Sequence, residues 1–244
     1  MINTIIQGDC KTLFPEISKK HKIDLVLTDP PYNINFKGYD VYKDNLPDNE
    51  YIALLSMLKD YPVCLIHYPE ETTKYVVPAL GTNVTKKIVW CYDSNSFTPN
   101  HNPRLFRDIS IYNKIPDFTR IKRPYKWVND KRTRRRIENG SQGRKLADWW
   151  DDITLIRNVH KEKTAHPCQI PVNLFIRLLL LLTNEGDLIV DPFIGSGSVA
   201  LACLWTNRSY IGIELSEKYV EISNKRIEAW KSKHIDIFGG AESL

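Results

Sequence analysis

The sequence predicts an α/β fold in which helices cover both faces of a sheet. Two observations support this prediction. Short apolar runs typical of buried strands, residues 23–27 and 188–190 among them, alternate with segments whose apolar residues recur at helical spacing. Both runs lead into an aspartate, Asp29 or Asp191, and open α/β sheets bind ligands at the carboxyl ends of their strands. With 244 residues, the chain suits one such domain with an insertion.

The N-terminal half contains a strand that two prolines bring to an end. Strand 23–27 stops at Pro30 and Pro31, which cannot continue a ladder of hydrogen bonds. Residues 33–49 are polar, and a loop of this length is more often functional or mobile than structural. The other expected elements are an edge strand at 4–6, a helix at 13–17 interrupted by Pro15, a helix at 51–58 capped by Asp48, a strand at 63–66, a weaker helix at 70–80 ended by Gly81, and strands at 87–92 and 109–113.

The C-terminal half contains a strand, a glycine turn, a helix and a second strand. Gly195 and Gly197 follow the strand at 188–190 and allow the backbone to pass close to a ligand. The second strand ends on Glu214, where a carboxylate can accept bonds from both hydroxyls of a ribose. A third glycine three positions after Gly197 is missing, which argues against a nicotinamide or flavin dinucleotide. The remaining elements are a packed helix at 172–183 with Gly186 beyond it, a helix at 199–204, a strand at 210–213 and a last helix capped by Ser216.

The cysteines and the N-terminus indicate a cytoplasmic protein. The five cysteines are odd in number, scattered and never in a CxxC pair, which indicates reduced thiols and no zinc or other metal site. Residues 1–10 lack a basic run followed by an apolar core, and the apolar run at 178–182 is too short to cross a bilayer. We therefore expect no membrane partner.

Basic residues are concentrated between Lys114 and Lys145. Twelve lysines and arginines stand there against three acids, although the net charge of the whole chain is only +5. A basic segment on a slightly acidic body is typical of a protein with a polyanionic partner. One interpretation is a lobe that contacts nucleic acid, and the alternative is a solvated loop. The residues expected to contact nucleic acid are Lys114, Arg120, Lys122, Arg123, Lys126, Arg132, Arg134, Arg135, Arg136 and Arg144.

Three motifs resemble those of one enzyme family. They are DPPY at 29–32, HPCQIP at 166–171 and DPFIGSGS at 191–198. Together they resemble the beta-group DNA amino-methyltransferases, in which the DPPY element precedes the target-recognition region and the cofactor loop comes last. Gly8-Asp9 also resembles a small element of the family beside the adenosine or target pocket. Cys168 and Ile170 depart from the family pattern His-Pro-Thr-Gln-Lys-Pro.

The resemblance implies a Rossmann-like sheet that binds S-adenosylmethionine and a basic target-recognition insertion. The catalytic domain would comprise residues 1–113 and 149–244, with residues 114–148 inserted. The residues expected to be catalytic are Asp29, Pro30, Pro31 and Tyr32. Those expected to bind the cofactor are Asp9, Asp29, His166, Pro167, Asp191, Phe193, Gly195, Ser196, Gly197, Ser198 and Glu214.

Two of these assignments have structural alternatives. Asp191 could cap a helix or bond its own turn instead of contacting the cofactor. His166 precedes a proline and could be only a turn residue. Cys168 follows a proline, as does the nucleophile of enzymes that methylate cytosine carbon, but it lies inside the HPCQIP element, so a nucleophilic role is not expected.

The chemistry of an amine substrate fits the DPPY element. An exocyclic base amine is a poor nucleophile because its lone pair is delocalised into the ring. Asp29 and the carbonyl of Pro30 can accept its N–H bonds and favour a pyramidal nitrogen, while Tyr32 can stack on the base. Because such attack is impossible inside a duplex, the target nucleotide must be flipped out and its amine aligned with the methyl donor.

The main hypothesis is a site-specific DNA adenine-N6 methyltransferase of a bacterium or phage. The resemblance favours adenine because the first residue of DPPY is Asp29 and not serine. A cytosine-N4 DNA methyltransferase is the close alternative, and a non-catalytic DNA-binding relative is the second. The basic segment does not distinguish DNA from RNA. The resemblance also suggests a homodimer, and it leaves open a cognate restriction nuclease as a partner.

Overall fold

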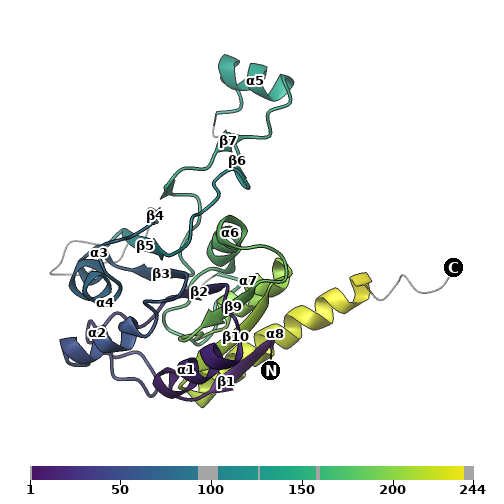
Figure 1. Ribbon diagram of the computed structural model, residues 1–244. Helices are drawn as coiled ribbons and strands as arrows, with labels where there is room; N and C mark the ends of the chain where they lie inside the picture. Colours follow the sequence, from purple (N-terminus) through teal and green to yellow (C-terminus); the bar gives the residue numbers. More distant parts are fainter. Residues whose placement is uncertain (1, 93–103, 126, 158–159, 239–244) are drawn as a thin grey trace.

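A computed structural model describes residues 2–92, 104–125, 127–157 and 160–238 (Figure 1). In this part of the chain the main sheet has eight strands. Their order across the sheet is β1 (Thr4–Gln7), β10 (Ser209–Glu214), β9 (Leu188–Asp191), β2 (Leu25–Thr28), β3 (Val63–His67), β5 (Phe106–Tyr112), β4 (Lys86–Cys91) and β8 (Trp149–Trp150).

Strands β1, β10, β9, β2 and β3 are parallel to one another, whereas β5 runs antiparallel to its neighbours β3 and β4. Strands β9 and β2 are far apart in the sequence but adjacent at the centre of the sheet, with Val26 opposite Val190. The strands that follow β2 in the chain, from β3 to β8, lie on one side of this pair, whereas β10, which follows β9, lies on the other side. The carboxyl ends of β2 and β9 therefore open onto one crevice, which is where ligands bind in such sheets.

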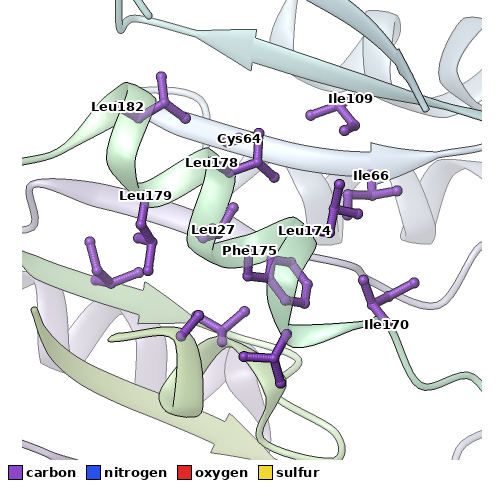
Figure 2. Packing of buried hydrophobic residues seen from close by; sticks show 14 of the residues in the cluster. Leu27, Cys64, Ile66, Ile109, Ile170, Leu174, Phe175, Leu178, Leu179 and Leu182 are labelled. Carbon is purple, nitrogen blue, oxygen red and sulfur yellow. The ribbon is translucent and has the colours of Figure 1, made fainter. Parts of the chain in front are cut away.

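Helices cover both faces of the sheet. Successive side chains of a strand point to opposite faces, and in the buried strands the side chains on both faces are apolar. In β2, Leu25 and Leu27 belong to the hydrophobic cluster of α6 (Val172–Leu182) and α7 (Ser198–Trp205). Val26 belongs to the opposite cluster, with α1 (Cys10–Lys20) and α2 (Asp48–Ser56). Figure 2 shows the first cluster, in which α6 lies across β2, β3 and β5. The last helix, α8 (Glu217–Phe238), contacts β1, β10 and α7.

Two helices differ from the expectations at prolines. Pro15 does not interrupt α1, which runs through it with Phe14 and Ile17 buried. The expected helix at 70–80 is divided into α3 (Pro69–Glu71), a π-helical turn η1 (Thr72–Val76) and α4 (Val77–Leu80). Pro78 lacks an N–H and its ring conflicts with the preceding helical turn, which accounts for the wider π geometry before it.

The basic segment forms an arm that projects from the sheet (Figure 1). Strands β6 (Lys122–Arg123) and β7 (Arg144–Lys145) pair as an antiparallel ribbon, and α5 (Lys131–Glu138) lies at the far end. Asp130 begins α5 by accepting bonds from the backbone N–H groups of Arg132 and Thr133, each at 3.0 Å. Trp150 then returns the chain to the core in β8, fully buried. No helix in the described part of the chain is both long and apolar enough to span a membrane.

Candidate active site

The two central strands are joined by a buried hydrogen bond at their carboxyl ends. Thr28 Oγ1 donates to Asp191 Oδ1 at 2.6 Å, and the same oxygen accepts from the backbone N–H of Phe193 at 3.0 Å. Burial raises the pKa of Asp191 to about 7. Asp191 thus bonds its own turn, as the structural alternative supposed, and also fixes β9 against β2.

A cavity of about 270 Å³ opens at this edge of the sheet. Asp29 after β2 and Glu214 at the end of β10 both line it, although they are far apart in the sequence. The apolar part of its wall comes from Phe193, Ile213 and Leu215. The expected cofactor-binding residues that line this cavity are Asp9, Asp29, His166, Phe193, Gly195 and Glu214.

Glu214 ties the glycine turn to the start of the last helix. Its Oε2 accepts from the backbone N–H of Gly195 at 3.0 Å, and its Oε1 accepts from that of Ser216 at 2.8 Å. Burial raises the pKa of this carboxyl. Because each carboxylate oxygen has a further lone pair, Glu214 can still accept hydrogen bonds from two hydroxyls in the cavity.

The glycine turn requires glycine at two positions. Gly195 and Gly197 have φ of +51° and +78°, in the left-handed region. A Cβ at Gly195 would lie 3.0 Å from His166 Nε2, and one at Gly197 would lie 3.0 Å from the Cβ of Ser223. Ser223 holds the turn in place, because its hydroxyl donates a hydrogen bond to the carbonyl of Gly195 at 2.6 Å. Glycine is therefore required by the backbone angles and by the close packing of the turn; Gly195 lines the cavity, whereas Gly197 lines neither the cavity nor the recess beside it.

His166 and Ser196–Ser198 complete the far side of the turn. The ring of His166 is buried against Tyr219, 4.4 Å between centroids, and burial lowers its pKa to about 4, so the ring is neutral near pH 7. Arg226 donates to the carbonyl of Ser196 at 2.6 Å and to Ser198 Oγ at 3.2 Å. Ser196 and Ser198 line a narrower recess next to the main cavity, whereas Pro167 does not line either space.

A second pocket, of about 120 Å³, lies on the other side of Asp29. Asp29, Tyr39 and Cys168 line both the pocket and the cavity. The hydroxyl of Tyr32 donates to Asp29 Oδ1 at 2.5 Å. The remaining wall of this pocket comes from Ile34, Phe36, Asp44, Tyr68 and Arg107. Its aromatic rings suit a planar, flipped base, which could present its amine to Asp29.

Burial determines the charge state of Asp29. It raises the pKa of this carboxyl to about 6, and both the positive charge of Arg107 and the hydrogen bond from Tyr32 act in the opposite direction. Asp29 is therefore ionised near pH 7 and can accept N–H bonds. With this pKa, it can also hold a proton briefly.

The backbone of the DPPY element is fixed by two side chains behind it. The Tyr51 hydroxyl donates to the carbonyl of Pro31 and lies 3.1 Å from His67 Nε2. His67 is fully buried beneath the ring of Tyr32, 4.5 Å between centroids, and its pKa is lowered to about 3 by burial. A neutral imidazole and a tyrosine thus support the element from the core side.

A family model described as DNA methylase matches residues 23–225. The chain belongs to this family. It is 34% identical over 230 residues to the type II methyltransferase M2.DpnII of Streptococcus pneumoniae, covering 86% of this chain and 84% of that protein. It is 27% identical to the DNA adenine methyltransferase YhdJ of Escherichia coli (strain K12), over 92% of this chain and 82% of that one.

The fold of this methylase is shared with solved structures. A complex of M1.HpyAVI with SAM superimposes with a TM-score of 0.60 at 18% identity, covering 92% of this chain and 98% of that one. The predicted α/β fold of an S-adenosylmethionine-dependent methyltransferase and the predicted family are therefore confirmed, with S-adenosylmethionine as the family's cofactor. The cavity fits such a nucleoside, since it combines a glycine turn, apolar walls and a carboxylate with free lone pairs.

Two aspartates, Asp40 and Asp44, hold the loop after the DPPY element of the methylase in place by hydrogen bonds. The buried carboxylate of Asp44 accepts from the backbone N–H groups of Asn33, Ile34 and Phe36 at 2.7, 3.0 and 3.1 Å. Asp40 Oδ2 accepts from Ser216 Oγ at 2.6 Å, which closes the loop across the cavity. The sequence indicated a functional loop here, but neither the pairing of these residues nor the role of Asp44 could be read from it.

Three residues of the site lie outside the motifs, and their roles could not be predicted from the sequence. Tyr51, His67 and Arg107 reach the DPPY element from α2, β3 and β5. None of them belongs to a recognisable motif. Only the pairing of β5 beside β3 brings Arg107 to Tyr32, and that pairing depends on tertiary structure.

The ten basic residues that were expected to contact nucleic acid differ in their exposure and in their partners within the chain. Arg120 donates to the carbonyl of Thr183 at 2.7 Å and to Asn184, and Arg123 is paired with Asp151, so these two guanidinium groups are engaged within the chain. Lys114 is half-buried, and Lys126 lies outside the described residues. The exposed members are Lys122, Arg132, Arg134, Arg135, Arg136 and Arg144.

Proposed function

We propose that this protein is an S-adenosylmethionine-dependent DNA methyltransferase that acts on the N6 amine of a flipped adenine. The observation that carries the proposal is the position of Asp29, which lines both the cavity of Glu214 and the pocket of Tyr32. A cofactor in the first space and a base in the second would meet at this carboxylate. The amine of the base would then have direct access to the methyl donor.

Each residue has a defined task in this reaction. When bound, S-adenosylmethionine supplies an electrophilic methyl group on its sulfonium. Glu214 would accept hydrogen bonds from the ribose hydroxyls, and the turn at Gly195 would hold the methionine part. Asp29 and the carbonyl of Pro30 accept the two N–H bonds of the amine, which orients its lone pair toward the methyl group. The new bond between nitrogen and the methyl carbon would replace the bond between that carbon and sulfur, which departs as a thioether, and Asp29 would take the surplus proton of the amine and release it to solvent.

Adenine is the favoured target on two grounds. The DPPY element begins with Asp29, as in the adenine enzymes that the chain resembles, and YhdJ is named as an adenine enzyme. Cytosine-N4 methylation would use the same two acceptors, because the cytosine amine has similar geometry.

We assign DNA binding to the basic arm. The exposed arginines of α5 can neutralise phosphates, while β6 and β7 hold this helix away from the sheet. We place the enzyme in the cytoplasm of a bacterial cell, where genomic DNA is accessible. A homodimer and a cognate nuclease stay predictions from the resemblance, and sedimentation velocity would test the first.

Nucleoside mass spectrometry of DNA treated with the enzyme and S-adenosylmethionine tests the proposal. We expect N6-methyladenine from the parent protein and none from Asp29→Ala, which should still bind DNA. Asp60→Asn is the matched control, because Asp60 is an exposed carboxylate away from the site, and it should retain full activity. N4-methylcytosine as the sole product would refute adenine as the target. DNA binding without any methyl transfer by the parent would favour the non-catalytic relative.

A further inference from the structure

Arg107 is a half-buried cation in the wall of the pocket of about 120 Å³, called the base pocket below. Its guanidinium carbon lies 5.4 Å from the ring centre of Tyr32 and 5.3 Å from that of Tyr68. The rings of Trp90 and Tyr92 lie at 5.6 and 5.9 Å. These four rings surround the guanidinium group and hold it in place.

Two donors of this guanidinium are buried without an acceptor. Nε and Nη1 of Arg107 have no hydrogen-bond partner among the described residues. Leaving a buried charged donor unpaired is costly, so these two nitrogens need an explanation, and a ligand that accepts from them supplies one. The contrast with Arg104 is clear, because that arginine lies 4.5 Å from the ring of Tyr68 but is paired with Glu71 at 3.2 Å.

The position of Arg107 restricts the kind of acceptor. It lines the pocket of about 120 Å³ together with Asp29 and Tyr32. The carboxylate of Asp29 accepts hydrogen bonds, whereas Arg107 can only donate them. The two groups therefore suit a planar ligand with an amine next to a hydrogen-bond acceptor. The aromatic wall favours a flat ring over a phosphate.

We propose that Arg107 binds the target base by donating a hydrogen bond to a ring nitrogen next to the amine. In adenine the amine is flanked by N1 and N7, and in cytosine by N3. The inference rests on the proposed function, because it requires a flipped base whose amine lies at Asp29. Arg107 then fixes the base in its plane and rejects bases without an acceptor at that position.

Base analogues that delete one ring nitrogen test this role. A duplex carrying the target site, mapped by methylation-sensitive sequencing, is prepared with adenine, 1-deazaadenine or 7-deazaadenine at the methylated position. If the product is N4-methylcytosine, cytosine and 3-deazacytosine take their place. We compare kcat/KM for the parent, Arg107→Met, Arg107→Lys and the control Arg104→Met.

The parent should lose roughly 10- to 100-fold in kcat/KM on one analogue, as expected for a hydrogen bond from a charged donor. Arg107→Met should be slowed by a similar factor on the natural base and should no longer distinguish that analogue from it. Arg107→Lys keeps the charge without the planar fork and should lie between the two. Arg104→Met should discriminate as the parent does. Thermal melting and cofactor binding verify that each variant is folded.

Two results would overturn the inference. Equal discrimination by the parent and by Arg107→Met would show that another group reads the ring nitrogen. Equal rates of the parent on every base would show that no ring nitrogen is read, and therefore that Arg107 does not bind the base in this way. In both cases the methyltransferase activity itself would stand. A parent that methylates no DNA would instead refute the proposed function, and this inference with it.

Discussion

Thr28 and Asp191 are hydrogen-bonded at 2.6 Å across the two strands that carry the DPPY element and the glycine turn. The bond is buried and joins residues 163 positions apart. Because the peptide after Thr28 leads to the pocket of Tyr32 and the peptide after Asp191 leads to the cavity of Glu214, this bond sets the position of one space relative to the other.

Replacing Thr28 by valine should therefore weaken both folding and cofactor binding. Valine keeps the shape but removes the hydroxyl, which leaves one bond fewer to a buried carboxyl. We expect the free energy of unfolding to fall by about 1–2 kcal/mol in urea titrations. Calorimetry should show weaker binding of S-adenosylmethionine. Thr28→Ser retains the donor and serves as the control; equal losses in both variants would contradict the role of the hydroxyl.

Activity should rise with pH through the titration of Asp29. Its pKa is raised to about 6 by burial, and the ionised carboxylate is the form that accepts the amine, so kcat/KM should be low at pH 5 and reach a plateau above pH 7. The hydrogen bond from Tyr32 lowers this pKa. Residual activity of Tyr32→Phe should thus have its midpoint at higher pH. An unchanged or lower midpoint would disagree with this assignment.

Alanine at Gly195 should affect the cofactor more than alanine at another strained glycine. Both Gly195 and Gly186 have positive φ, so alanine at either should cost about 1–2 kcal/mol of stability. A Cβ at Gly195 would also press on His166, whereas one at Gly186 would meet no atom within 4 Å. We expect only Gly195→Ala to weaken cofactor binding in calorimetry. Equal affinities of the two variants would argue against a role of the turn.

Removing the arginines of α5 should weaken DNA binding without changing the cofactor site. Glutamine at Arg132, Arg134, Arg135 and Arg136 should reduce the slope of log affinity against log salt by up to about 4, roughly one for each phosphate that is no longer neutralised. Fluorescence anisotropy at several salt concentrations measures this slope. The control replaces four exposed lysines of α8, and a similar decrease there would indicate only a general charge effect. The control positions are Lys218, Lys225, Lys231 and Lys233.

The sequence was sufficient where local pattern determines structure. The strand before Asp191, the turn with Gly195 and Gly197 and the helix after it appear in the structure close to their expected positions. The position of Glu214 at the end of its strand was also predictable, because βαβ spacing is regular. These features depend on residues near each other in the chain.

The sequence was insufficient where function depends on distant pairing. Nothing in the pattern of β5 indicates that it runs antiparallel between β3 and β4, and only this arrangement brings Arg107 into the pocket of Tyr32. The same holds for Tyr51, which bonds the carbonyl of Pro31 from α2. Helical periodicity also could not show the π turn before Pro78, where a missing N–H breaks a regular pattern.

A crystal structure with sinefungin and a duplex containing the mapped site tests most directly whether base and cofactor meet at Asp29. We expect the ribose of sinefungin at Glu214, the target base outside the helix in the pocket that Tyr32 and Arg107 line, and its amine within hydrogen-bonding distance of the Asp29 carboxylate. A base that remains stacked in the duplex, or a cofactor bound away from Asp29, would contradict the account.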